Sequence, residues 1–362
     1  MGKQKIFIRK KIKKTPYVLF YTYLLIALLS IFSVASYTWF ELSWTPQVSN
    51  MNVYITSNSG LELAADPGAE VWSNQLDIYT TKELSKFKDS EEKPSLRQTT
   101  WSDRDQTFYG PLYGYDGRLL NVIGKDYSER EIVSWYKLED LIHANSLSYS
   151  SYYIKATLYA RCGQPVDVML AEPMIVNDQG IQGAGTYVIA DPNTGRGPET
   201  AIRIGMRLTP VDSGGNPLGD TGPMIIYEPN ADRHVDGSTD YIPTYSIDEL
   251  RTEETTEAPT GETSTDPTDA APEKKEWLLV DEERLIKQTF SRRNEPGEFL
   301  TNPTLFSLKP GEIIRIELYI WLEGQDVDCS NAMSDGVSTT KIEANIQFTG
   351  TSETQSGMVP IE

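Results

Sequence analysis

The stretch from Gly311 to Phe348 constrains the fold of this 362-residue chain more than any other. Every even position from Ile314 to Leu322 is aliphatic, whereas the odd positions hold charged or aromatic side chains. A second alternating run covers residues 342–348. Because a period of two places successive side chains on opposite faces of a strand, the sequence predicts two strands here. A polar loop that carries Cys329 joins them.

Further short strands are predicted earlier in the chain, separated by turns rich in Gly and Pro. They cover residues 49–55, 60–63, 76–79, 152–160, 166–170, 186–190, 202–208 and 224–227. Short strands punctuated in this way are typical of all-β domains. We therefore expect an all-β fold, specifically an antiparallel β-sandwich or jelly-roll-like domain with one or two short helices. The helical candidates are residues 81–88, 129–143 and 277–291.

The N-terminus combines a basic head, residues 1–15, with an uncharged segment, residues 16–40. At about 1.5 Å per residue, Val18–Ser36 nearly spans a hydrocarbon core of roughly 30 Å. Since a positive flank stays in the cytoplasm, we expect a transmembrane helix in the cell membrane, crossing once, with the C-terminal domain outside. The alternative is a signal peptide cleaved near Ala35, which predicts a secreted or cell-wall protein.

The net charge argues against one class of partner. The formal charge is −19, and because the head supplies seven positive charges the remainder carries −26. A body this acidic repels phosphate backbones. We therefore expect no nucleic acid partner.

The region after the membrane segment is expected to form one extracytoplasmic β-domain, residues 45–350, with a flexible tail at 351–362. Residues 252–276 interrupt it with eight acids, seven threonines, three prolines and no large apolar side chain. Such a segment cannot bury enough apolar surface to offset its ordering entropy, so it is predicted to be disordered. The strands after it are too few to form a core alone and are expected to return to the sheet begun before it.

The loop after residue 322 is the candidate metal site. Asp326, Asp328 and Asn331 crowd oxygen ligands together, and calcium prefers such ligands. The spacing does not match an EF-hand loop, and a solvated acidic loop is the alternative. No nucleophile, acid–base or cofactor-binding pattern converges elsewhere. Ser213 lies in a stretch of Asp, Ser, Gly, Asn and Pro that is typical of a turn. We therefore expect no catalysis and no cofactor.

The chain has two cysteines, Cys162 and Cys329. An even count in an exported protein permits a disulfide. Both residues follow predicted strands, so they could meet at one end of a sheet. Two buried free thiols are the alternative.

Residues 101–117 are dense in aromatic residues and glycine and are expected to form a loop. Four of the rings, Trp101, Tyr109, Tyr113 and Tyr115, are candidates for stacking on sugars, because the apolar faces of sugar rings suit aromatic planes. Packing of these rings over one end of the domain is the alternative.

Two stretches resemble a known group of proteins. Residues 32–40, Phe-Ser-Val-Ala-Ser-Tyr-Thr-Trp-Phe, resemble the export segment of Gram-positive surface proteins with SipW-type signal peptides. The run Tyr319–Cys329, followed by Ala344–Phe348, is similar to the last strands of such proteins, of which the TasA/camelysin-like matrix proteins are the best known. The resemblance implies a cell-surface protein with a jelly-roll-like fold that can form fibres by strand exchange.

Together these features predict a surface protein with a structural or adhesive role and no catalytic activity. Its partners are the lipid bilayer through residues 16–40 and either cell-wall glycan or like subunits. Assembly through an exposed edge strand is expected to use residues 313–322 and 342–348. The alternative is an extracytoplasmic glycan-binding module that uses the aromatic residues of the 101–115 region.

Overall fold

The computed structural model describes about half of the chain. The described residues are 21, 23–26, 47–48, 50–90, 94, 96–103, 106–111, 122–125, 131–133, 135–139, 152–173, 185–190, 198–231, 284–289, 297–324, 326, 329 and 341–351. Two compact units are distinguished, Met1–Trp44 and Thr45–Glu362. Within the described part of the chain, no helix has the length and apolar character needed to cross a membrane. Most of the predicted span 16–40 lies outside the described residues, as does the acidic segment 252–276.

The second unit is all-β, which confirms the predicted fold class. Among its described residues, helical structure includes three short 3-10 segments, Ile78–Thr80 (η1), Ser85–Phe87 (η2) and Pro198–Thr200 (η4), and residues 138–139. The prediction of purely antiparallel sheets is wrong. Parallel pairing joins β14 (Ile225–Glu228) to β15 (Leu285–Lys287), and it also joins two pairs of strands described below.

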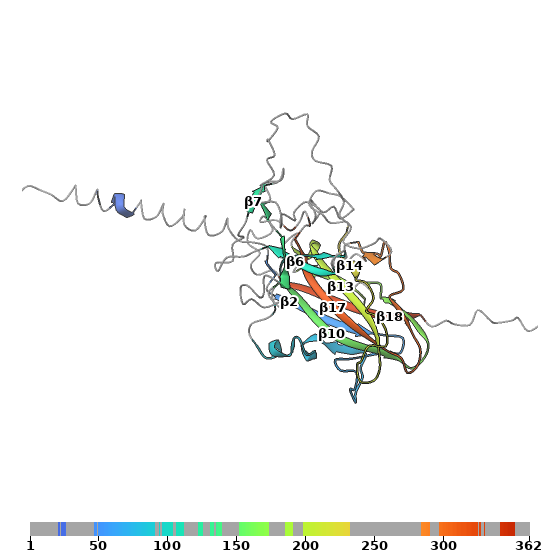
Figure 1. Cartoon of the computed structure of the whole chain (residues 1–362). Coiled ribbons are helices and arrows are strands. Elements are labelled where there is room, and N and C mark those ends of the chain that lie inside the picture. Colours follow the sequence, from blue (N-terminus) through green and yellow to red (C-terminus); the bar gives the residue numbers. More distant parts are fainter. Residues whose placement is uncertain are drawn as a thin grey trace, which may run out of the picture. The chain divides into compact units, whose positions relative to one another are not determined.

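The larger sheet has ten strands and is centred on β17 (Ile313–Glu323), which lies between β10 (Tyr153–Cys162) and β13 (Ile202–Val211) (Figure 1). β13 is followed by β14 and β15. The remaining members are β1 (Gln47–Val48), β3 (Leu61–Ala64), β5 (Leu96–Ser102), β6 (Thr107–Pro111) and β9 (Trp135–Lys137). β5 runs parallel to the last residues of β17.

The second sheet has six strands and is centred on β18 (Lys341–Thr351). On one side β18 pairs with β11 (Val166–Leu170) and then β12 (Tyr187–Ala190), and on the other it runs parallel to β2 (Asn50–Ser57). The edge strands among the described residues are β4 (Gln75–Asp77), β16 (Phe306–Leu308) and β12, which pairs with β18 alone. A separate ribbon pairs β7 (Val122–Lys125) with β8 (Glu131–Val133).

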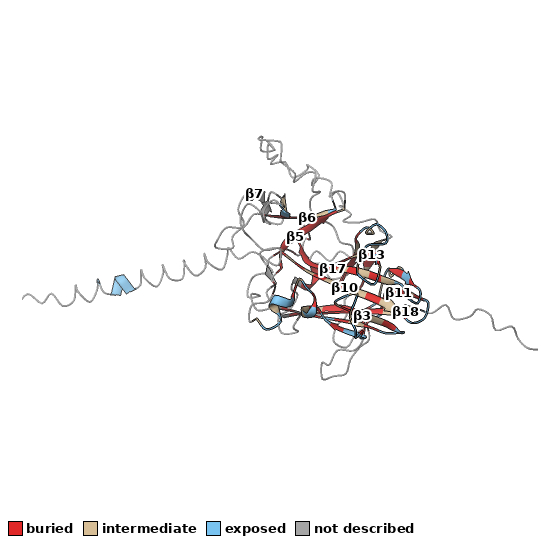
Figure 2. Cartoon of the chain, turned by 60° about the horizontal axis from the view of Figure 1, so that its bottom comes forward, coloured by how far each residue is buried: buried red, intermediate tan, exposed pale blue. Residues whose placement is uncertain are grey.

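One hydrophobic core lies between the two larger sheets, and its residues appear red in Figure 2. The even positions of β17 from Ile314 to Leu322 supply one side of it, together with even positions of β10 and β13. Alternate residues of β18 from Ile342 to Phe348 supply the other side. The predicted alternation in these strands is confirmed. Each fully buried Leu, Ile or Phe side chain contributes about 1.5–3 kcal/mol relative to exposure.

A second apolar cluster covers the opposite face of β17 near its end. Tyr319 and Trp321 pack there with residues of β5, of β6 and of the segment directly before β14, including Trp101, Phe108 and Met224. Gly205 of β13 faces this cluster, and a Cβ at that position would lie 2.5 Å from the Met224 sulfur. The end of β17 is therefore buried on both faces, which explains why its odd positions turn from charged to aromatic.

Three local predictions are corrected by the structure. In the described part of the helix predicted at 129–143, residues 131–133 and 135–137 form strands β8 and β9 and residues 138–139 are helical, while in the described part of the helix predicted at 277–291, residues 285–287 form strand β15. The expected loop at 101–117 contains the end of β5 and all of β6. All three segments are rich in β-branched and aromatic residues, and pairing with neighbouring strands decided their state over local helix signals.

The predicted assembly edge is also wrong. β17 has β10 on one side and β13 on the other, and β18 has β11 and β12 on one side and β2 on the other. Only a strand with unpaired backbone groups can accept a further strand. The two strands lie inside their sheets because they pair with strands more than 100 residues earlier in the chain, before segment 252–276.

Candidate functional site

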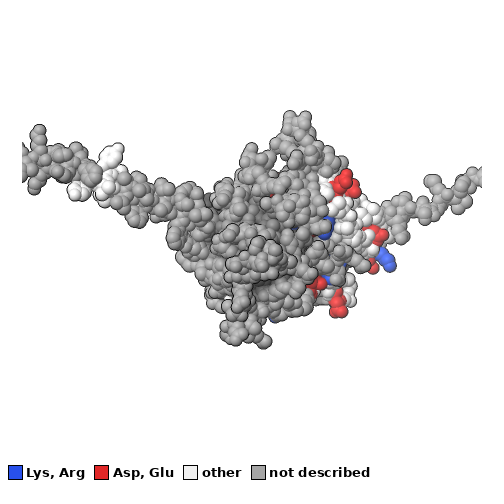
Figure 3. Space-filling model, turned by 90° about the horizontal axis from the view of Figure 1, so that it is seen from above, with Lys and Arg blue, Asp and Glu red and all other residues white. Residues whose placement is uncertain are grey.

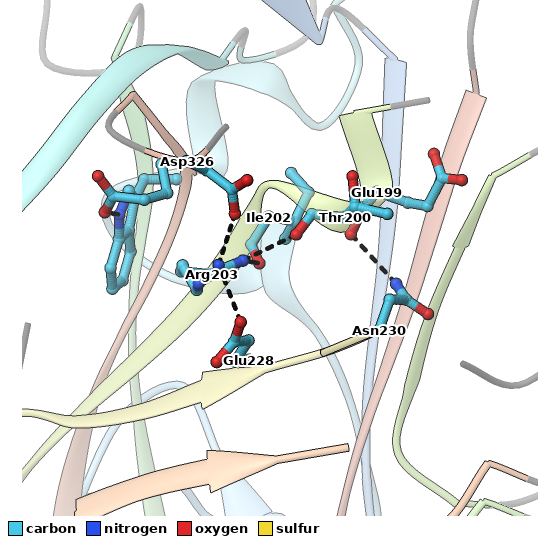
Figure 4. A network of polar contacts seen from close by, with 9 residues as sticks. Glu199, Thr200, Ile202, Arg203, Glu228, Asn230 and Asp326 are labelled. Carbon is cyan, nitrogen blue, oxygen red and sulfur yellow. Dashed lines mark hydrogen bonds and ion pairs between the residues drawn. The ribbon is translucent and has the colours of Figure 1, made fainter. Parts of the chain in front are cut away.

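The most unusual polar feature of the described core is a buried ion cluster around Arg203 of β13. Its Nη2 lies 2.6 Å from Oδ2 of Asp326 and 3.1 Å from Oε1 of Glu228, and all three side chains are fully buried (Figure 4). Nη1 of Arg203 donates to the carbonyl oxygens of Thr200 and Ile202, each at 2.9 Å. The guanidinium is thus bonded on several sides by oxygen.

Strand register brings this cluster together. Arg203 lies opposite Trp321 in the pairing of β13 with β17, so it sits beside the aromatic cluster. Glu228 ends β14, the next strand. Asp326 belongs to the turn after β17, where its N–H donates to the Glu323 carbonyl at 3.2 Å. A buried ion pair is strongly destabilising to break, because the remaining charge loses its partner in a low-dielectric setting.

Further buried polar groups are hydrogen-bonded near this cluster. Trp321 Nε1 donates to Glu323 at 2.9 Å, and Asn230 Nδ2 donates to the carbonyls of Val188 and Glu199 at 3.1 Å. Gln288 Nε2 donates to the Thr186 carbonyl at 2.9 Å. Asn230 and Gln288 therefore hold β12 of the second sheet against the β14–β15 edge of the first. Such satisfied buried amides fix the relative position of the elements that they join.

The calcium candidate has a different role in the structure. Asp326 is neither solvated nor available as a ligand, because its carboxylate is committed to Arg203. Asp328 and Asn331 lie outside the described residues. Within the described ranges, no group of three or more acidic, histidine or cysteine side chains is placed to hold a metal ion.

The candidate Cys162–Cys329 disulfide is not formed, and the alternative of two buried thiols agrees with the structure. β10 and β17 are antiparallel with Arg161 opposite Ile313, so Cys162 lies beside the beginning of β17. Cys329 follows the end of β17. The two ends of that 11-residue strand are on the order of 30 Å apart, far beyond the reach of a disulfide.

The two described aromatic candidates, Trp101 and Tyr109, do not present a stacking surface. Trp101 is 2% exposed and Tyr109 is fully buried. Trp101 packs edge-on against Phe108, with ring centroids 4.9 Å apart. The packing alternative therefore holds for these two rings, while Tyr113 and Tyr115 lie outside the described residues.

The turn at Ser213 is as predicted. The Asp212 carboxylate accepts hydrogen bonds from the backbone N–H groups of Gly214 and Asn216 at 2.9 and 2.8 Å. Hydrogen bonds, that from the Asn216 side chain foremost, lower the pKa of Asp212. The two histidines of the chain, His143 and His234, lie outside the described residues.

The outer face of the larger sheet carries a second polar group of residues. Lys155 of β10 and Glu317 of β17 form an ion pair at 2.8 Å. Burial, the largest single influence, lowers the pKa of Lys155, but hydrogen bonds and attraction from Glu317 and Tyr319 together outweigh it and raise that pKa. Beside this pair lie Arg207 of β13 and Arg315 of β17, both partly exposed.

The sequence did not reveal which of the two β13 arginines, Arg203 or Arg207, is buried. Arg203 and Arg207 occupy equivalent positions in the alternation of β13, and nothing local distinguishes them. Register does, since Arg203 pairs with Trp321 and Arg207 with Glu317. No protein-family model, no curated protein and no solved structure matches this chain.

Proposed function

We propose that this chain is a bacterial cell-surface protein with a structural or adhesive role, tethered to the membrane by residues 16–40. The observation that carries the proposal is the order of its parts: a basic head, an uncharged segment of membrane-spanning length, and an acidic all-β body. The positive-inside rule places that body outside the cell. The role itself is non-catalytic in this proposal.

The architecture is consistent with this role. Two sheets that share a core are the arrangement of a β-sandwich, and we propose a jelly-roll-like variant with mixed pairing. The buried ion cluster and the amide contacts of Asn230 and Gln288 join separate strands. A domain stiffened in this way suits mechanical or adhesive work. The resemblance of residues 32–40 to SipW-type export segments agrees with a surface location.

The test is the location of the body and the fate of the N-terminal segment in the native cell. External protease on intact cells is expected to digest the β-domain, and the membrane fraction is expected to hold a chain that begins at Met1 or Gly2. A start at Ser36 or Tyr37 in the wall or medium would replace the tether with a released subunit. Digestion only after lysis would refute a surface location.

A further inference from the structure

The outer face of β10, β17 and β13 presents two rows of side chains in register. In one row Thr157, Glu317 and Arg207 lie side by side, and in the next Tyr159, Arg315 and Thr209 do. These residues occupy odd positions, opposite the core. All except Thr209 are partly exposed, so solvent and ligands reach this face.

Arg207 and Arg315 form no ion pair with any described residue. Arg207 Nε donates to the Gly222 carbonyl at 3.5 Å, and its guanidinium carbon lies over the Trp101 ring, 6.0 Å from the centroid. Arg315 Nη2 donates to Thr209 Oγ1 at 3.2 Å. The buried Nε of Arg315 has no hydrogen-bond acceptor among the described residues. A buried donor without an acceptor costs free energy of folding. A rotation that brings Arg315 Nε to an anionic ligand would therefore break no hydrogen bond of that nitrogen and would supply the missing acceptor.

The acids around these arginines are already engaged. Glu317 pairs with Lys155 at 2.8 Å. Glu83 accepts from the hydroxyl of Thr157 at 2.6 Å and from its N–H at 3.3 Å. Asp66 accepts from the Gly68 N–H at 2.8 Å. The contrast with Arg203, whose guanidinium holds two carboxylates, marks Arg207 and Arg315 as cations with donors to spare.

We propose that Arg207, Arg315 and Tyr159 bind the carboxylate-bearing sugars of an acidic polysaccharide. A guanidinium matches a carboxylate through two parallel hydrogen bonds. Arg207 and Arg315 are diagonal neighbours on adjacent strands, with Cα atoms about 7–8 Å apart. Tyr159 adds an apolar ring face, and Thr221, whose hydroxyl bonds Thr209 Oγ1 at 2.9 Å, adds a hydroxyl at the rim.

The acidity of the whole body does not prevent such binding. Both acidic and basic side chains are visible among the described residues in the view of Figure 3. At physiological ionic strength the field of exposed charges is screened within about 8 Å, so a ligand at this face responds mainly to its immediate surroundings. The proposal rests on the surface location proposed above, because a polysaccharide partner requires exposure outside the cell.

The probe is a hexamer of galacturonic acid, with its fully methyl-esterified form as the control that keeps the sugars and removes the charge. Binding to the full chain in mild detergent is measured by isothermal titration calorimetry. Arg207→Gln and Arg315→Gln are each expected to weaken binding roughly tenfold, the scale of one charge-assisted contact. Arg315→Lys keeps the charge without the paired geometry and is expected to fall between wild type and Arg315→Gln.

Arg161→Gln is the matched control, since Arg161 lies on the same strand as Tyr159 but pairs with Glu62 at 2.8 Å and covers the Trp72 ring. It is expected to bind the hexamer as the wild type does. The proposed site would be overturned if the ester bound as tightly as the acid. It would also be overturned if both glutamine variants kept the affinity and the thermal unfolding of the wild type. So would binding of a 252–276 peptide that needs both arginines while the hexamer does not bind. Protease digestion of intact cells decides the surface location separately.

Discussion

Arg203 and Asp326 are 123 positions apart in the sequence, yet their side chains meet at 2.6 Å in the core. The contact ties the turn after β17 to the first residues of β13. Both side chains are fully buried, so neither charge has water to replace its partner.

Removing Asp326 is expected to destabilise the domain strongly. Asp326→Ala removes the shorter of the two carboxylate contacts of Arg203 while the pair with Glu228 remains, and loss of a buried hydrogen bond to a charged group costs about 1.5–3 kcal/mol. Urea denaturation of the full chain in mild detergent measures the change. Asp220→Ala, at an exposed turn position, is the control and is expected to stay within about 0.5 kcal/mol of wild type. Equal stability of the two variants would contradict the structural role of the cluster.

Gly205→Ala is expected to disturb the aromatic cluster. The added Cβ would lie 2.5 Å from Met224 Sδ and 2.9 Å from the Trp321 ring, and overpacking of this kind costs about 1–3 kcal/mol. The unfolding midpoint and the tryptophan fluorescence spectrum should both shift. Gly219→Ala is the control, because nothing lies within 4 Å of a Cβ there. A Gly205→Ala variant with wild-type stability would show that the cluster is looser than described.

The two cysteines are expected to titrate as thiols. Without any reductant, unfolded protein should react with two equivalents of a thiol reagent, whereas the native protein should react slowly because both side chains are buried. Burial also raises the pKa of the Cys162 thiol, which lowers its thiolate fraction and its reactivity. A titration that yields no thiols until a reductant is added would contradict this.

Asp103 is expected to make stability depend on acid pH. Its carboxylate lies 2.9 Å from Arg284 Nη2. Burial alone would raise its pKa, but the hydrogen bond and attraction of Arg284 prevail and lower it. The folded-state pKa is therefore below the unfolded value of about 3.9, so the contribution is present above that value and lost as pH falls through the folded one.

Because the pair is partly exposed, its contribution at pH 7 is expected to be about 0.2–1 kcal/mol. Urea midpoints of wild type and Asp103→Asn, compared between pH 7 and pH 2.5, test this. The difference should shrink as the pH falls through the folded-state pKa. A difference that stays constant with pH would show that the loss comes from packing.

The sequence by itself determined the all-β class, the positions of the main strands and the face that each presents to the core. These follow from the period-two pattern of Ile314–Leu322 and its counterparts, which depends only on backbone geometry. The same local pattern could not predict that Arg203 is buried and Arg207 partly exposed, because both stand at odd positions of one strand and therefore on the same face of the sheet.

Only the tertiary structure decided those assignments, through pairings between residues far apart in the sequence. The antiparallel register of β10 with β17 separates Cys162 from Cys329, and the flanking strands make β17 and β18 interior. Register with Trp321 likewise buries Arg203 beside Asp326. Strand order and direction are set by which apolar faces can close one common core, a condition that acts on the whole chain at once and leaves no local mark in the sequence.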